Sequence, residues 1–179
     1  MEQDIEILRY PIGKFTAPDK FRKGEIKRQI KEIDKLPKRL KDAVKNLSAQ
    51  QLDTPYRDGG WTIRQVVHHL ADSHINSYCR FRFALTEANP TILPYLEAQW
   101  AELPDAKSGD IKLSLDLLKN LHKRWIILLK LLTKEDLHRT FFHPQKNRAQ
   151  PLFEVIALYA WHSNHHLAHI TVLKKRRNW

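Results

Sequence analysis

Residues 25–47 read EIKRQIKEIDKLPKRLKDAVKNL, and this stretch decides how the fold is interpreted. Its apolar side chains follow one another at steps of three and four residues, which is the spacing of one face of an α-helix. Pro37 lies inside the pattern and lacks a backbone N–H, so we expect a kink or a break near Leu36. The stretch predicts one long amphipathic helix with an apolar face of Ile26, Ile30, Ile33, Leu36, Leu40, Val44 and Leu47.

Three further segments, residues 62–88, 111–132 and 151–174, carry the same helical spacing. A long crossover over residues 90–110, with perhaps one helical turn, joins the second helix to the third. Residues 139–150 have no helical period, and we expect a loop or a short extended piece there. Four long helices and no alternating strand pattern predict an all-α fold, specifically a four-helix bundle, with an orthogonal or solenoid helical fold as the alternative.

Two pairs of polar residues predict where helical segments begin. Ser48 with Gln51 and Thr62 with Gln65 both have the spacing of a capping box, in which each side chain bonds the backbone N–H of the other residue. We therefore expect a short helical turn after Ser48 and the second long helix after Thr62.

Length and composition predict one domain without a membrane span. The 179 residues suffice for one domain with a real core, so we expect a single domain over residues 1–179 with an N-terminal arm over residues 1–17. The longest apolar block, WIILLKLL, is interrupted by Lys130. The segment MEQDIEILRY lacks the basic and apolar regions of a secretory signal, and the single Cys79 cannot form an internal disulfide. A cytoplasmic location is the expectation.

The formal net charge of +11 raises the question of nucleic-acid binding. Residues 19–47 hold eleven Lys or Arg against five Asp or Glu, and KKRR follows at residues 174–177. Lysines on the solvated face of a helix, and basic residues opposing the macrodipole at a helix C-terminus, explain both groups. The chain has no zinc-finger spacing, aromatic RNA-binding signature or Gly-rich phosphate loop, so we do not expect a nucleic-acid partner.

Four of the ten histidines lie in residues 161–170, WHSNHHLAHI. Residues four apart share one face of a helix, so the stretch contains two pairs, His162 with His166 and His165 with His169. The two pairs cannot all face inward together. We expect His165 and His169 to face inward, with His166 further round the helix, because the first pair shares a stripe with Leu158, Trp161, Ala168 and Val172.

A third metal ligand has to come from another element, and VVHHLADSH at residues 66–74 offers three histidines. His68 lies among polar neighbours, and His74 lies within the apolar stripe itself. We therefore predict that His69, at the edge of the stripe, is the third ligand. A lone pair of histidines four residues apart is as often buried in the core as it is bound to a metal. The second cluster favours metal binding, because imidazole is a common metal ligand and burying several imidazoles without a partner costs free energy. The predicted ligands of a divalent ion are His69, His165 and His169.

Three imidazoles leave one position of a tetrahedral ion open for water or substrate, as in catalytic zinc sites. The peptidase motif H-E-x-x-H is absent, because residue 166 is a histidine where the motif has glutamate. Asp72 and Asn164 are candidates to orient the ligands through hydrogen bonds. No residue is identified as a general acid or base.

Three long segments of the chain resemble the DinB-like superfamily, in particular its YfiT-type metal-dependent hydrolases. These are YPIGKF (10–15), QLDTPYRDGGWTIRQVVHHLADSHINSY (51–78) and LYAWHSNHHLAHIT (158–171). The resemblance implies a four-helix bundle, a cytoplasmic homodimer and one divalent ion per chain, Zn²⁺ ahead of Ni²⁺, held by three histidines. Matched by motif, these histidines are again His69, His165 and His169.

The resemblance also implies a choice of activities. YfiT-type proteins are described as metal-dependent hydrolases, and relatives in the superfamily are thiol transferases that add a thiol such as bacillithiol to electrophiles. We predict a metal-dependent hydrolase that acts on a small-molecule substrate at the open position of the ion. A thiol S-transferase is the alternative, and a non-enzymatic bundle stabilised by its metal is a third possibility.

Overall fold

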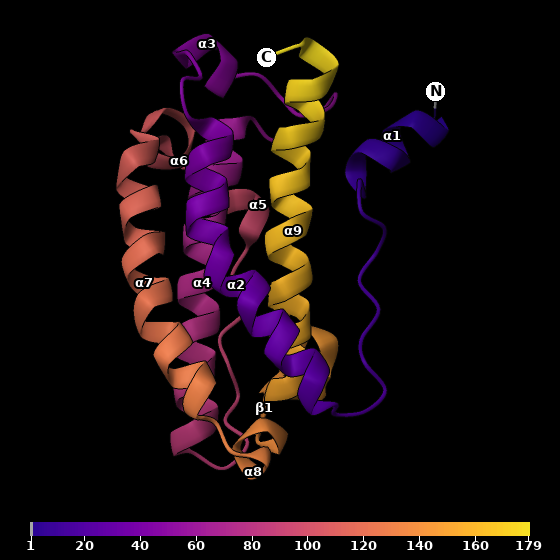
Figure 1. Cartoon of the computed structure of the whole chain (residues 1–179), viewed down its shortest axis with the longest axis vertical. Coiled ribbons are helices and arrows are strands. Elements are labelled where there is room, and N and C mark those ends of the chain that lie inside the picture. The colour runs from indigo at the N-terminus through magenta and orange to yellow at the C-terminus, as the bar shows by residue number, and fades with distance from the viewer. Residues whose placement is uncertain (1) are drawn as a thin grey trace.

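Four long helices build the fold. The structure, a computed structural model, describes residues 2–179, with side chains from residue 5 onward. Helices α2 (Lys23–Val44), α4 (Ile63–Thr86), α7 (Ile111–Leu131) and α9 (Leu152–Arg177) form an elongated bundle (Figure 1). The predicted all-α four-helix bundle is confirmed, with a small two-stranded sheet added to it.

Pro37 bends α2 without ending it. The helix is continuous from Lys23 to Val44, and its two halves point in different directions (Figure 1). Because proline has no N–H, the carbonyl of Ile33 loses its usual helical donor. His122 on α7 takes that place, since its Nδ1 donates to the Ile33 oxygen at 2.8 Å. A neighbouring helix thus satisfies the carbonyl that the proline leaves free.

The connections contain more structure than the sequence predicted. The crossover from α4 to α7 holds two short helices, α5 (Glu97–Trp100) and α6 (Pro104–Ser108), instead of one turn. The short helix α3 (Ala49–Leu52) follows α2, as the capping box at Ser48 predicted, and a further short helix, α8 (Lys134–His138), follows α7. The segment before α9 is an antiparallel hairpin of β1 (Thr140–His143) and β2 (Arg148–Pro151), joined by the 3₁₀ turn η1 (Pro144–Lys146).

The N-terminal arm follows the outer side of α9. Helix α1 (Glu2–Arg9) stands beside the C-terminal half of α9 in Figure 1. The indole Nε1 of Trp161 donates to the carbonyl of Gly13 at 3.1 Å, and Phe15 packs on the same indole with ring centroids 5.9 Å apart. The arm therefore covers a face of α9 that the other long helices leave open.

The core fills the space between the four long helices. One cluster surrounds Trp125, Phe81 and Phe141, and a second surrounds Leu40, Leu70 and Leu118. Over residues 2–179, no helix combines the length and the apolar character that crossing a membrane requires.

We expect Thr62→Ala to lower the free energy of unfolding by about 1 kcal/mol, the usual cost of losing an N-cap. The Thr62 hydroxyl accepts from the Gln65 N–H at 3.1 Å, and the Gln65 side chain accepts from the Thr62 N–H at 2.9 Å, so α4 begins with a complete capping box. Urea denaturation measures the change. Thr171→Ala, on the exposed side of α9, is the control and should change the free energy of unfolding by less than half as much. Equal changes in the two variants would contradict a specific contribution of the Thr62 cap.

Candidate metal centre

Helices α4 and α9 bring three histidines together. The capping box at Thr62 fixes the start of α4, and His69 lies two turns further on, facing α9. The Nε2 atoms of His69 and His162 lie 3.2 Å apart, and the ring centroids of His69 and His166 lie 4.7 Å apart. One ring nitrogen from each of the three lies within 4.8 Å of the others. His69 and His166 are buried and His162 is partly exposed.

The predicted ligands are only partly found in this group. His69 belongs to it, whereas His165 and His169 lie on the adjacent side of α9, under the N-terminal arm. The ring of His165 stacks on Trp161 at 4.3 Å, and the ring of His169 stacks on Tyr56 at 3.9 Å. The Nε2 of His169 donates to the carbonyl of Arg9 at 3.1 Å. The set His69, His165 and His169 stays a prediction, and the geometry favours His162 and His166 as the partners of His69.

The expected orientation of His166 has to be corrected. The sequence placed His166 away from the core because apolar neighbours accompany His165 and His169 in the stripe. In the structure α9 is buried on most sides, with His165, His166 and His169 all less than 9% exposed. The N-terminal arm covers the face of α9 that carries His165 and His169. Apolar neighbours therefore accompany both faces of the helix and do not identify the face that meets α4.

The remaining histidines near the cluster have structural partners. His68, expected among solvated residues, is buried, and its Nδ1 lies 2.8 Å from the Ser114 hydroxyl. His74 is wholly buried as its place in the stripe indicated, and its Nδ1 lies 2.9 Å from Nε2 of His122. His122, the partner of His74, was not among the histidines expected near the site from the sequence. Its position four residues after Leu118 and three before Trp125 places it in the apolar stripe of α7, and that signal was available.

Asp72 and Asn164, the two residues expected to orient the ligands, do not bond the clustered histidines. The Asn164 amide oxygen accepts from Arg39 at 2.7 Å, and its nitrogen donates to the carbonyl of Ala160 at 3.1 Å. Asp72 is half-buried, and burial raises the pKa of its carboxyl to about 6, with a smaller contribution from Asp105. Among the described residues, no hydrogen bond joins Asp72 or Asn164 to a histidine of the cluster.

Burial keeps the clustered imidazoles neutral. It lowers the pKa of His69 to about 3, with further lowering from neighbouring histidines, and it holds the pKa values of His162 and His166 well below their usual range for the same reasons. Neutral imidazoles offer a lone pair at one ring nitrogen, which is the form that binds a metal.

The three residues fit a divalent ion. Ligand nitrogens at Zn–N distances of 2.0–2.1 Å in a tetrahedral shell lie about 3.3 Å apart, close to the 3.2 Å between His69 and His162. Among the described residues, Nδ1 of His166 is buried without a hydrogen-bond partner, so protein contacts alone do not satisfy this polar atom. A donor set of three imidazoles suits zinc, nickel, copper or iron and leaves an open position on a tetrahedral ion.

Hydroxyl groups and an indole surround the three histidines. The Ser73 hydroxyl lies 3.5 Å from Nε2 of His162 and 3.2 Å from the Tyr159 hydroxyl. Tyr159 donates to the carbonyl of Ser73 at 3.0 Å, and burial raises the pKa of its phenol. The indole of Trp61 packs on His69 with centroids 4.7 Å apart. The cluster thus combines neutral ring nitrogens with neighbouring hydroxyl groups.

Comparison with known proteins places these features in context. The sequence pattern of the DinB superfamily matches residues 32–170. Proteins named "Putative metal-dependent hydrolase" from Bacillus cereus (strain 03BB102) and Bacillus anthracis (strain A0248) are each 56% identical over 172 residues, which cover 96% of this chain and 98% of theirs. The solved structure of YfiT from Bacillus subtilis, described as "a probable metal-dependent hydrolase with an unusual four-helix bundle topology", is 49% identical. It superposes with a TM-score of 0.94, covering 97% of this chain and 99% of that one.

Proposed function

The chain belongs to the DinB superfamily, and from that membership we propose that it is a metal-dependent hydrolase whose divalent ion is held by His69, His162 and His166. The observation that carries the proposal is the meeting of three neutral imidazoles, from two helices, within 4.8 Å. The names of its relatives support the same class of activity.

Residues beside the proposed ion site provide polar groups for a substrate. A bound divalent ion with an open position supplies a water that ionises near neutral pH and a Lewis acid for a polarised oxygen. Ser73 places its hydroxyl 3.5 Å from Nε2 of His162, where it can donate to a substrate oxygen, and Tyr159, which donates to the carbonyl of Ser73, lies 3.2 Å from that hydroxyl.

The test compares the chelator-treated protein with the same protein reloaded with Zn²⁺ or Ni²⁺. We expect hydrolysis of at least one class in a panel of esters, amides and phosphoesters, present only with metal. Turnover that requires both a thiol and an electrophile would reassign the chain to the thiol S-transferases. Metal that raises the melting temperature but supports no turnover would favour the non-enzymatic bundle. The homodimer and the cytoplasmic location stay predictions.

We expect His69→Ala to lower metal-dependent turnover by more than about 100-fold, because the change removes a proposed ligand, and losing only a hydrogen-bond partner of a metal ligand already costs about 10–100-fold. The matched control is His68→Ala, one residue earlier on α4, where the ring contacts Ser114 and the carbonyl of Gly109 instead of α9. Initial rates at saturating metal measure the effect. Equal losses in the two variants would contradict the assignment of His69 as a ligand.

A further inference from the structure

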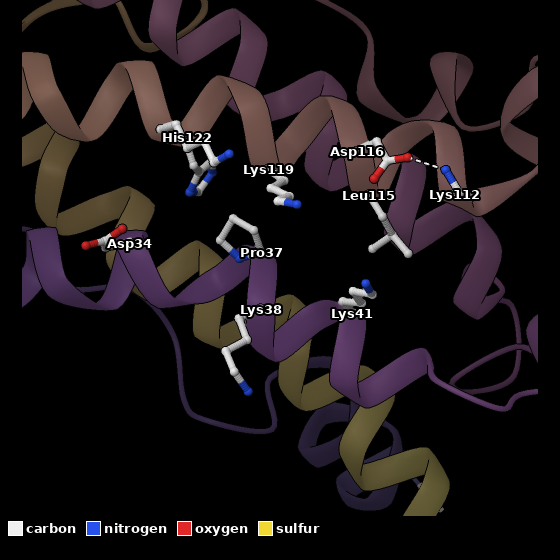
Figure 2. Close-up of a pocket in the computed structure, with 10 residues that line it drawn as sticks. Asp34, Pro37, Lys38, Lys41, Lys112, Leu115, Asp116, Lys119 and His122 are labelled. Carbon is white, nitrogen blue, oxygen red and sulfur yellow. Dashed lines mark hydrogen bonds and ion pairs between the residues drawn. The ribbon is translucent and has the colours of Figure 1, made fainter.

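The outer face of α7 carries a row of exposed side chains. Helix α7 packs on α2 and α4 and forms one edge of the bundle (Figure 1). Figure 2 shows His122, Lys119 and Leu115 on the side of α7 that faces α2, where they line a groove of about 480 Å³. The exposed row, which we call the α7 stripe, follows another side of the helix. Its residues are Leu113, Leu117, Asn120, Arg124, Ile127 and Leu131.

Four large apolar side chains of the stripe face solvent. Leu113 is 72% exposed, Leu117 47%, Ile127 64% and Leu131 74%. Single exposed leucines are ordinary on a protein surface, but several that share one face of a helix are typical of a contact surface. Within the described chain, no other element covers this face of α7.

The spacing of the stripe is that of a seam between two helices. Its residues follow one another at alternating steps of four and three, which is the period of the a and d positions along which one helix packs on another. The side of α7 that packs inside its own bundle carries buried residues such as Leu118 and Trp125. The stripe is therefore a second seam on the same helix, and it has no partner in the bundle.

The stripe has the same order of residues from either end, with two apolar residues and then one polar residue. The equivalent positions about residue 122 are 113 with 131, 117 with 127, and 120 with 124. Two copies of α7 that meet antiparallel about a two-fold axis place these positions face to face. Apolar residues then meet apolar residues, and the Arg124 guanidinium of one copy meets the Asn120 amide of the other, whose oxygen accepts hydrogen bonds.

Other occupants explain less of this pattern. A parallel pair of helices would place Arg124 against its own copy, and like charges repel. A membrane surface would take up the apolar ends of the stripe but would also have to accommodate Asn120 and Arg124 between them. Neither occupant requires the symmetry about residue 122, whereas a two-fold contact between identical chains does.

We propose that the α7 stripe docks a second copy of this chain, with the two α7 helices packed antiparallel about a two-fold axis near residue 122. The family resemblance implies a homodimer but no surface for it, and the contact proposed here rests on the exposed stripe. Helix α7 carries none of the three clustered histidines, so the contact does not depend on the proposed metal centre.

Disulfide trapping tests the antiparallel register. Leu117→Cys and Ile127→Cys are prepared as separate proteins in a Cys79→Ser background, which removes the chain's single cysteine. In the proposed contact each new thiol lies about 15 Å along the helix from its own copy, too far for a disulfide, but faces the thiol of the other variant. With oxidised glutathione, we expect the mixture to form a linked dimer and each protein alone to form little. Equal linkage in each protein alone, or none in the mixture, would overturn the proposal.

Sedimentation equilibrium measures the association itself over the micromolar range. We expect Leu117→Glu, which places a charge in the seam, to weaken self-association at least about ten-fold. The matched control is Lys119→Glu, two residues further on α7 and lining the groove beside α2, which should stay within two-fold of the wild-type protein. Circular dichroism checks that both variants keep their helices. A wild-type protein that stays monomeric, or equal effects of the two changes, would overturn the proposal. Binding to anionic vesicles without self-association would do the same and would favour a membrane as the occupant.

Discussion

Replacing His162 and His166 together with alanine should leave the protein without bound metal, whereas replacing His165 and His169 should leave about one ion per chain. The two double variants are matched, since both pairs lie four residues apart on α9 and both lose two largely buried imidazoles. They differ in what they face, because His162 and His166 point toward His69 while the other pair contacts Tyr56, Trp161 and the arm.

The expected loss of affinity in the first variant exceeds the roughly 10–100-fold that losing a hydrogen-bond partner of a ligand costs, because two of the three proposed ligands are removed. Elemental analysis of protein purified without a metal-affinity tag, before and after incubation with Zn²⁺ or Ni²⁺, measures the stoichiometry. Loss of the ion from the His165 and His169 variant alone would instead establish the set predicted from sequence, with His69 common to both. A bound ion that both double variants retain would contradict both ligand sets and leave these histidines as buried core residues.

The helices were predictable because their signals are local. The stripe from Ile26 to Val44 specifies α2, and the capping boxes at Ser48 and Thr62 mark the starts of α3 and α4 as the structure has them. The hairpin before α9 was expected only as a loop or a short extended piece, and its first strand also pairs with the distant crossover: the Ile92 N–H donates to the carbonyl of Phe142, and the Phe142 N–H donates to that of Pro90. Strands of four residues carry too short a pattern to predict alone.

The candidate site was predicted in kind but not in orientation. Clusters of histidines on two amphipathic helices indicated a metal centre, and His69 is in the group that the structure brings together. The choice between the two pairs on α9 required knowing what covers each face. The arm that covers His165 and His169 through Tyr10 and Arg9 is more than 150 residues away in sequence, and no local pattern reports that contact.

We expect the metal-free protein to lose stability steeply as the pH falls from 7 to 5. Nine histidines have depressed pKa values, chiefly because of burial: the pKa falls to about 3 for His69 and to about 4 for His122, His165 and His169, it is held well below its usual range for His74, His162 and His166, and it is lowered for His68 and His143. In the unfolded chain each titrates near 6.5. Below pH 6.5 the unfolded state therefore binds more protons, so stability is fully present above that pH and falls toward the folded-state pKa values.

Each of these histidines removes up to about 1.4 kcal/mol of stability per pH unit below 6.5, so the group together removes the 5–15 kcal/mol of a typical domain within one to two units. Urea denaturation with a chelator present, at half-unit steps from pH 8 to 5, measures the slope. His165→Phe with His169→Phe removes two of the nine titrating groups and should reduce the slope by about two-ninths, which ties the effect to the histidines and separates it from carboxylates. An unfolding free energy that is the same at pH 7 and pH 5 would contradict the neutral, buried cluster, and with it the supply of lone pairs on which metal binding at His69, His162 and His166 depends.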